Sequence, residues 1–155
     1  MRTSIQNLEF KLFLGKFSTS LEPKNLFSVP AAFRAHLSNR MYITQGFDRN
    51  LQVLTADAFQ EIYRKVISLN IADPLARLLL RLILGTATEL GTDNNNLMIP
   101  DNLKEFANLQ EDILLIGQGD YFEIWAPDQW NKQEAQLLDA ETNSARFSAL
   151  TVATH

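Results

Sequence analysis

The chain has 155 residues, 46% of them hydrophobic, which excludes extensive disorder and allows one core of ordinary size. Its formal net charge of −4 excludes nucleic-acid binding through bulk charge, so any such binding needs a local cationic patch. The absence of cysteine excludes disulfides, cysteine-ligated zinc, iron–sulfur clusters and thiol catalysis.

The chain contains an internal repeat, which favours two homologous halves over two unrelated segments of similar composition. Residues 14–34 match 84–104 at an offset of 70, and after one inserted residue the matches continue at an offset of 71. The matched pairs are Leu14/Leu84, Gly15/Gly85, Val29/Ile99, Pro30/Pro100, Phe33/Leu103, Arg34/Lys104, Ile43/Leu114, Gly46/Gly117, Leu51/Phe122, Val53/Ile124 and Phe59/Trp130.

Each half predicts the same series of elements: a strand, a polar turn, a short helix after a proline, and two strands joined by a hairpin. Proline fixes φ and asparagine tolerates left-handed backbone, so the polar stretches predict chain reversals. Such a unit, about 45 residues long, is too small to close a core alone. The expected strands and turns are 12–18, 22–25, 41–44 and 51–54 in the first half, and 85–90, 92–96, 113–116 and 122–125 in the second.

Helices are predicted between and after the repeats. Thr55 or Asp57 can cap the first, and Asp73 followed by proline begins the second, at 75–84. Another helix begins at Asp128. Apolar side chains cover nearly every side of the 75–84 helix, which one small domain cannot bury from one direction. We therefore expect an oligomer interface made by Leu75, Leu78, Leu79 and Leu82.

No segment predicts a membrane span or a signal peptide. The most apolar segment, 75–84, is short and contains Arg77 and Arg81, and polar residues interrupt the first 13 positions. We expect a soluble intracellular protein without a membrane partner.

Several strings of the sequence resemble the MraZ family, in order and with the family's spacing, over about residues 12–132. The resemblance implies an α+β fold in which two tandem AbrB-like (SpoVT-AbrB) swapped-hairpin modules form a pseudo-two-fold β-barrel with flanking helices. The implied organisation is a first module at 12–57, connecting helices at 58–81, a second module at 82–128 and a C-terminal helix at 129–150. The strings are Phe13-Leu14-Gly15, Leu21–Lys24, Ser28–Arg34, Thr44–Asp48, Asp73–Arg77, Arg81–Gly85 and Phe122–Trp130.

The resemblance also implies a function. Proteins of this kind are cytoplasmic, nucleoid-associated transcriptional regulators that form ring-shaped homo-oligomers and bind direct repeats in double-stranded DNA. It implies no enzymatic activity, cofactor, metal or small-molecule ligand. The residues agree with a non-enzyme, because Glu22 and Asp48 are isolated carboxylates and His36 has no visible serine or aspartate partner.

The family's DNA-binding signature, approximately D-P-K-G-R in the turn of each module, is altered here. The first copy is Glu22-Pro23-Lys24-Asn25-Leu26, and the second is Thr92-Asp93-Asn94-Asn95-Asn96. Both copies therefore lack the arginine, the side chain that can hold a guanine edge or a phosphate through two parallel hydrogen bonds.

Specific roles follow for the residues that remain. We expect Lys24 and Asn25 to approach the DNA groove, and Lys16 and Arg34 to hold phosphates. Glu22 is expected to order the first turn by accepting backbone N–H bonds. Contacts from the second copy are expected from Asn94 and Asn96.

Charge favours the first copy, since residues 13–40 carry a net +3 and residues 85–108 a net −3. Weak DNA binding would then be strengthened by the avidity of an oligomer. The alternative is an assembly or protein-partner module that has kept the fold and lost DNA binding. In that case Lys24, Asn25 and the asparagine run are solvated turns.

Overall fold

The main sheet is symmetric with respect to the two halves of the chain: each strand and its counterpart in the other half lie equally far from the centre of the sheet. The computed structural model describes residues 12–150, in which six antiparallel strands form one sheet and two short strands pair separately. In spatial order the sheet contains β1 (Lys16–Ser20), β7 (Asp112–Gly117), β8 (Tyr121–Trp125), β4 (Leu51–Thr55), β3 (Arg40–Gln45) and β5 (Thr88–Gly91). The separate pair is β2 (Leu26–Ser28) with β6 (Asn96–Met98).

Strands are exchanged between the two halves. The first half's β1 pairs with β7 of the second half, and the second half's β5 pairs with β3 of the first. In the β2–β6 pair, Phe27 lies opposite Leu97, its own repeat mate at the offset of 70. The strand pairing is thus two-fold symmetric about a point between the halves, and residues 20–30 and 91–100 occupy matching places around it.

The α+β class predicted from the sequence is confirmed, but the sheet is not closed. Within residues 12–150, β1 and β5 are its two edges and do not pair with each other. The expectation of a sealed β-barrel is therefore wrong as far as strand pairing goes.

Aromatic residues from both halves form one shared core. Phe13, Phe33 and Phe122 are fully buried, and their ring centroids lie 5.1–5.2 Å apart in each of the three pairings. Each buried aromatic side chain stabilises the fold by roughly 1.5–3 kcal/mol through removal of apolar surface from water. Phe122 lies more than eighty positions after Phe13 and Phe33 and belongs to the other half, so neither half has a core of its own.

Burial corrects the alignment of the repeats. Strands β3 and β7 share one pattern of buried and exposed positions, which aligns Ile43 with Leu115 rather than with Leu114. Gly46 and Gly117 are therefore not equivalent. Gly117 is needed because a Cβ there would collide with the backbone of Phe13 and Leu14, whereas a Cβ at Gly46 would meet the Asn50 side chain.

The helices begin close to their expected caps. Thr55 Oγ1 accepts from the backbone N–H of Ala58 at 3.1 Å, and Asp73 Oδ1 accepts from that of Leu75 at 2.9 Å. The capped helices are α3 (Ala56–Ile67) and α4 (Pro74–Thr86), and the short helices are η1 (Pro23–Asn25), α2 (Ala31–Arg34) and α5 (Asp101–Phe106).

Two expected boundaries are wrong. Helix α4 continues through Gly85, where a strand was expected, because the Thr86 hydroxyl bonds the Leu82 carbonyl and the Thr44 hydroxyl and so holds the last turn against β3. The single helix expected after residue 128 is two helices, α6 (Pro127–Leu137) and α7 (Ala140–Ser148). The break lies where Asp139 caps α7 by accepting from the backbone N–H of Thr142 at 3.2 Å.

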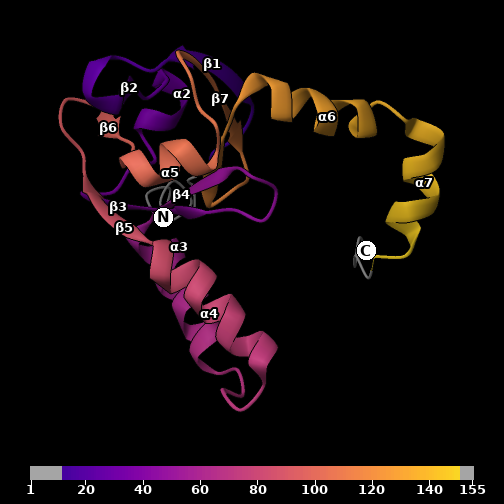
Figure 1. The fold of residues 1–155 in the computed structure, drawn as a ribbon. Coiled ribbons are helices and arrows are strands. Elements are labelled where there is room, and N and C mark those ends of the chain that lie inside the picture. The colour runs from indigo at the N-terminus through magenta and orange to yellow at the C-terminus, as the bar shows by residue number, and fades with distance from the viewer. Residues whose placement is uncertain (1–11, 151–155) are drawn as a thin grey trace, which may run out of the picture.

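Two helical arms extend from the sheet (Figure 1). Helices α3 and α4 form a hairpin that projects away from the strands, and α6 leads to α7 on another side. Among residues 12–150, no helix combines the length and the apolar character that a membrane crossing requires.

Candidate nucleic-acid interface

The first turn (residues 22–26) and the second turn (residues 92–96) flank the β2–β6 pair. The backbone N–H of Ile99 donates to the Asn25 carbonyl at 2.9 Å, and that of Val29 donates to the Asn95 carbonyl at 2.9 Å. These two bonds are repeat mates, so each turn is held by the strand of the other half. Because β2 and β6 pair antiparallel, with Leu26 opposite Met98 and Ser28 opposite Asn96, the two turns lie at the two ends of this three-residue ladder.

Both turns adopt the same unusual backbone. Lys24 and Asn25 have φ values of 65° and 61°, and Asn94 and Asn95 have values of 51° and 63°. Side chains with a Cβ disfavour this left-handed region, but asparagine tolerates it better than most. Asn25 and Asn95 can therefore stand where the family signature has glycine without changing the turn.

The Glu22 carboxylate does not order the first turn as expected, because it makes no capping hydrogen bond there. The backbone closes the turn instead, through the N–H of Glu22, which donates to the Leu26 carbonyl at 2.6 Å. A second restraint comes from the other half, where Asp101 Oδ1 accepts from Asn25 Nδ2 at 2.5 Å.

Because of the strand exchange, each turn has beside it a cation that comes from the other half of the chain. Arg34 Nε donates to the Val29 carbonyl at 2.8 Å, and Val29 is the residue bonded to Asn95 of the second turn. Lys104, the repeat mate of Arg34, lines a hollow of about 410 Å³ beside the first turn, together with Lys24 and Glu22. Lys104 was not among the site residues predicted from the sequence, although the repeat pairs it with Arg34.

Strand exchange brings residues of the acidic segment, Asp101 and Lys104, beside the first turn. The net charge of a sequence segment is therefore not the charge around one turn. Asp101 of the acidic segment contacts the first turn. The exposed cations placed beside the turns are Lys24 and Arg34, with the half-buried Lys104.

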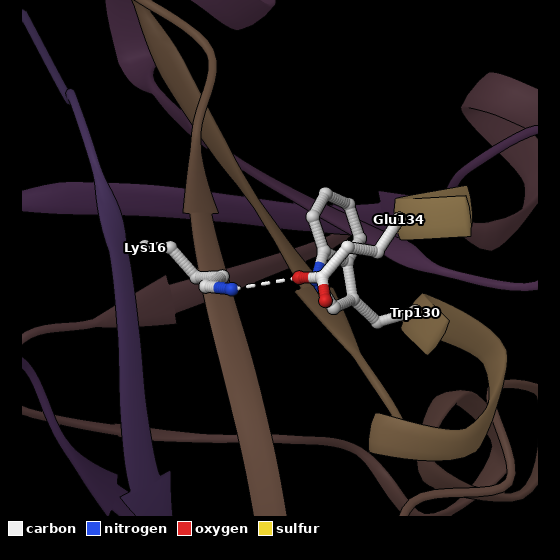
Figure 2. A network of polar contacts seen from close by, with 3 residues as sticks. All are labelled: Lys16, Trp130 and Glu134. Carbon is white, nitrogen blue, oxygen red and sulfur yellow. Dashed lines mark hydrogen bonds and ion pairs between the residues drawn. The ribbon is translucent and has the colours of Figure 1, made fainter. Parts of the chain in front are cut away.

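Lys16 lies beside Trp130 and Glu134 of α6 (Figure 2). It begins β1, four residues before Ser20, or about 13 Å along the strand. Its Nζ contacts Glu134 Oε2 at 2.8 Å, and the same oxygen accepts from Trp130 Nε1 at 3.0 Å. The hydrogen bond from Lys16, followed by that from Trp130, lowers the pKa of the Glu134 carboxyl. Lys16 thus connects α6 to the sheet instead of joining the turn residues.

The four leucines expected in an oligomer interface separate into two pairs. Leu75 and Leu78 are 70% and 61% exposed, whereas Leu79 and Leu82 are half-buried. The half-buried pair lies on α4, which packs against α3 and β3. Leu75 and Leu78 therefore offer uncovered apolar surface.

The chain is similar to known proteins along most of its length. Residues 83–151 match the family described as "MraZ protein, putative antitoxin-like". The chain is 35% identical over 131 residues to the transcriptional regulator MraZ of Thermomicrobium roseum, covering 84% of this chain and 92% of that protein. It is 36% identical over 138 residues to the transcriptional regulator MraZ of Roseiflexus castenholzii, covering 88% and 94%. With this similarity along most of both chains, the chain belongs to the MraZ family of transcriptional regulators.

Proposed function

We propose that this protein is a DNA-binding transcriptional regulator whose two turns form one DNA-contacting surface, with the first turn contributing most. The names of its relatives support regulation of transcription as the general role. The observation that carries the proposal is the matched geometry of the turns, which hold Lys24 and Asn94 in the same left-handed backbone at the two ends of the β2–β6 pair.

More cations lie at the first turn, although acids accompany them. Lys24 is exposed there and Lys104 lines the adjacent hollow with Glu22 and Glu111, whereas the second turn has one cation nearby, Arg34, and an aspartate, Asp93, within it. Phosphate contacts dominate protein–DNA affinity, and each lysine or arginine contributes separately. In this proposal Lys24 and Asn25 approach the groove, Lys104 and Arg34 contact phosphates, and Asn94 and Asn96 add contacts from the second turn.

Oligomerisation compensates for the missing arginines. A single surface with three nearby cations binds DNA weakly, but several copies engaging direct repeats together gain affinity through high effective concentration. The proposal therefore includes a ring-shaped homo-oligomer built on swapped-hairpin modules, acting at the nucleoid in the cytoplasm. The exposed Leu75 and Leu78 support the oligomer.

Fluorescence polarisation with labelled repeat-containing duplex, at low and at moderate salt, tests this function. Lys24→Glu should abolish binding, and binding by the wild-type chain should weaken as salt increases. Lys132→Glu, an exposed site on α6, is the matched control because it changes the net charge equally. Equal losses in the two variants would contradict the role of the first turn.

The second candidate is an assembly or protein-partner module without DNA binding. The observation that favours it is the occupation of the Asn25 amide by the Asp101 carboxylate, together with leucine and asparagine where the signature has arginine. Absence of binding by the wild-type chain even at low salt would leave this candidate and exclude the first.

A further inference from the structure

The second half of the chain holds Asn25 of the first turn at two points. The backbone N–H of Ile99 donates to the Asn25 carbonyl at 2.9 Å, and the side-chain Nδ2 of Asn25 donates to Asp101 Oδ1 at 2.5 Å. Asp101 is the first residue of α5, which follows β6 in the chain. The segment that pairs with β2 therefore continues into the residue that fixes the Asn25 amide.

The second turn lacks this side-chain contact. At the repeat offset of 70, the counterpart of Asp101 is Ala31, whose methyl group cannot accept a hydrogen bond. Asn95, the counterpart of Asn25, has the matching backbone bond, in which its carbonyl accepts from the N–H of Val29 at 2.9 Å. Asn95 is exposed, whereas Asn25 is half-buried. The contact with the carboxylate is thus particular to the first turn and is not required by the backbone that both turns share.

The carboxylate decides which way the Asn25 amide faces. An ionised carboxylate only accepts hydrogen bonds, so the amide nitrogen must face Asp101 and the amide oxygen must face away from it. Without such a partner, an asparagine amide can turn either its oxygen or its nitrogen outward. Asp101 therefore makes the Asn25 Oδ1, a hydrogen-bond acceptor, the group that the first turn offers, and it adds its own oxygens beside the turn.

Double-stranded DNA presents donors that match these acceptors. In the major groove adenine and cytosine carry an amino group, whereas guanine and thymine carry a carbonyl oxygen. Hydrogen-bond acceptors on the protein therefore favour the amino bases and repel the keto bases. A carboxylate also repels phosphates, so it weakens binding to DNA of every sequence.

We propose that Asp101 is a positioning residue that makes the first turn select an amino base, adenine or cytosine, at one position of the DNA. It acts through Asn25, whose oxygen accepts a hydrogen bond from the amino group of the base. Asp101 has this role only if the first turn contacts DNA, so the inference rests on the proposed function. It supplies sequence selectivity at a turn that lacks the signature arginine, and it does so at some loss of affinity.

Substitutions at Asp101 separate the acceptor from the charge. Asp101→Ala removes both, whereas Asp101→Asn removes the charge and keeps an oxygen that can accept from Asn25. The matched control is Asp128→Ala, because Asp128 is also an exposed aspartate in the first turn of a helix, α6. Urea unfolding of each variant records any change in stability separately from DNA binding.

Selection from a duplex library with randomised positions, followed by fluorescence polarisation at low salt, measures the preference. At the selected position the wild type should bind the amino bases about fivefold more tightly than the keto bases. Separate duplexes with adenine and with cytosine show which amino base is read. Asp101→Ala should lose the preference and bind the keto duplexes more tightly, since one negative charge is gone. Asp101→Asn should keep part of the preference, and Asp128→Ala all of it.

A further pair of variants tests whether Asp101 acts through Asn25. Asn25→Gly suits the left-handed backbone and removes the amide, so it should lose the preference as Asp101→Ala does. Adding Asp101→Ala to Asn25→Gly should then change the overall affinity and leave the ratio between duplexes unchanged. A merely structural role of Asp101 would not move this ratio, because a loss of folded protein affects all duplexes equally.

The outcomes separate this inference from the proposed function. A wild-type chain that binds DNA without an amino-base preference overturns the role of Asp101 and leaves DNA binding standing. An Asp101→Ala variant that keeps the preference has the same meaning, as does a preference that survives in Asn25→Gly. Absence of DNA binding by the wild-type chain overturns the inference together with the proposed function.

Discussion

The first and second turns have the same backbone and different chemistry. Both place two consecutive residues at positive φ, and each is bonded through its asparagine carbonyl to a strand of the other half. The first turn contains proline and lysine, whereas the second contains aspartate and three asparagines. Within one chain, strand pairing thus restricts which residues fit the backbone, while the exposed side chains have diverged.

This difference separates two kinds of constraint. Asn25 and Asn95 satisfy a requirement of the backbone, which has a positive φ at both positions. Leu26 and Asn96, the positions of the signature arginine, face no such requirement, since a strand accepts many residue types there. The side chain at these two positions can therefore change without a change of backbone, and under the proposed function such a change affects DNA recognition.

Restoring arginine should give the largest effect. Leu26→Arg should tighten binding to repeat DNA by about tenfold or more, because one bidentate contact to a base is worth about 1–3 kcal/mol. Asn96→Arg should give a smaller gain, since one cation, Arg34, lies near the second turn whereas Lys24 and Lys104 lie at the first. Titration by fluorescence polarisation at one salt concentration compares the two variants. A larger gain for Asn96→Arg would reverse the proposed ranking of the turns.

Replacing the left-handed asparagines should have an intermediate effect on stability. Asn25→Ala and Asn95→Ala should each lower the free energy of unfolding by about 1 kcal/mol, because alanine is strained at positive φ. The loss should be greater at Asn25, which also donates to Asp101. Urea unfolding measures both values. Asn25→Gly removes the strain but also the hydrogen bond, so a loss at Asn25→Gly measures the Asp101 contact.

The smallest expected effect is on thermal stability, from the cross-strand pair Gln52 and Glu123 at the centre of the sheet. Gln52 of β4 lies opposite Glu123 of β8, and burial raises the pKa of the Glu123 carboxyl. An acid with a raised pKa in the folded state destabilises the fold as pH rises above its usual value of 4.5. Glu123→Gln should therefore raise the Tm slightly at pH 7, with a difference that disappears below pH 4.5.

The same substitution at Glu134 is the control, because the pKa of this carboxyl is shifted in the opposite direction. Lys16 lowers the pKa of Glu134, so the ionised form stabilises the fold above the usual pKa, and this contribution is lost as pH falls through the folded pKa. Glu134→Gln should lower the Tm at pH 7. A shift in the same direction for both variants would contradict the assigned environments.

Local sequence patterns predicted the helices and strands, whereas contacts between distant residues determined the strand pairing and the end of α4. The caps at Thr55 and Asp73 and the two hairpins were predictable, because helix starts and tight turns depend on neighbouring residues. The exchange of β1 and β5 was implied by the family resemblance and leaves no local signal in the sequence. The end of α4 was mistaken because the Thr44–Thr86 bond joins residues 42 positions apart.

The candidate site, like the fold, was predictable where it depends on local sequence and not where it depends on distant contacts. The positions of Lys24, Asn25, Asn94 and Asn96 in paired turns follow from the repeat, and the two turns share one backbone geometry at the two ends of the β2–β6 pair. Lys16 was misplaced because its partner, Glu134, is 118 positions away. Lys104 could have been found by applying the repeat together with the exchange, which moves each cation to the opposite turn.

The exchange of edge strands has a consequence for how the chain is made. Lys16 of β1 pairs with Ile116 of β7, so the first strand leaves the ribosome long before its partner exists. The nascent N-terminal half must hold Phe13 and Phe33 without the ring of Phe122 until residue 122 has been translated. Synthesis of this protein thus includes a waiting period in which apolar surface is exposed, and the length of that period is set by the speed of translation.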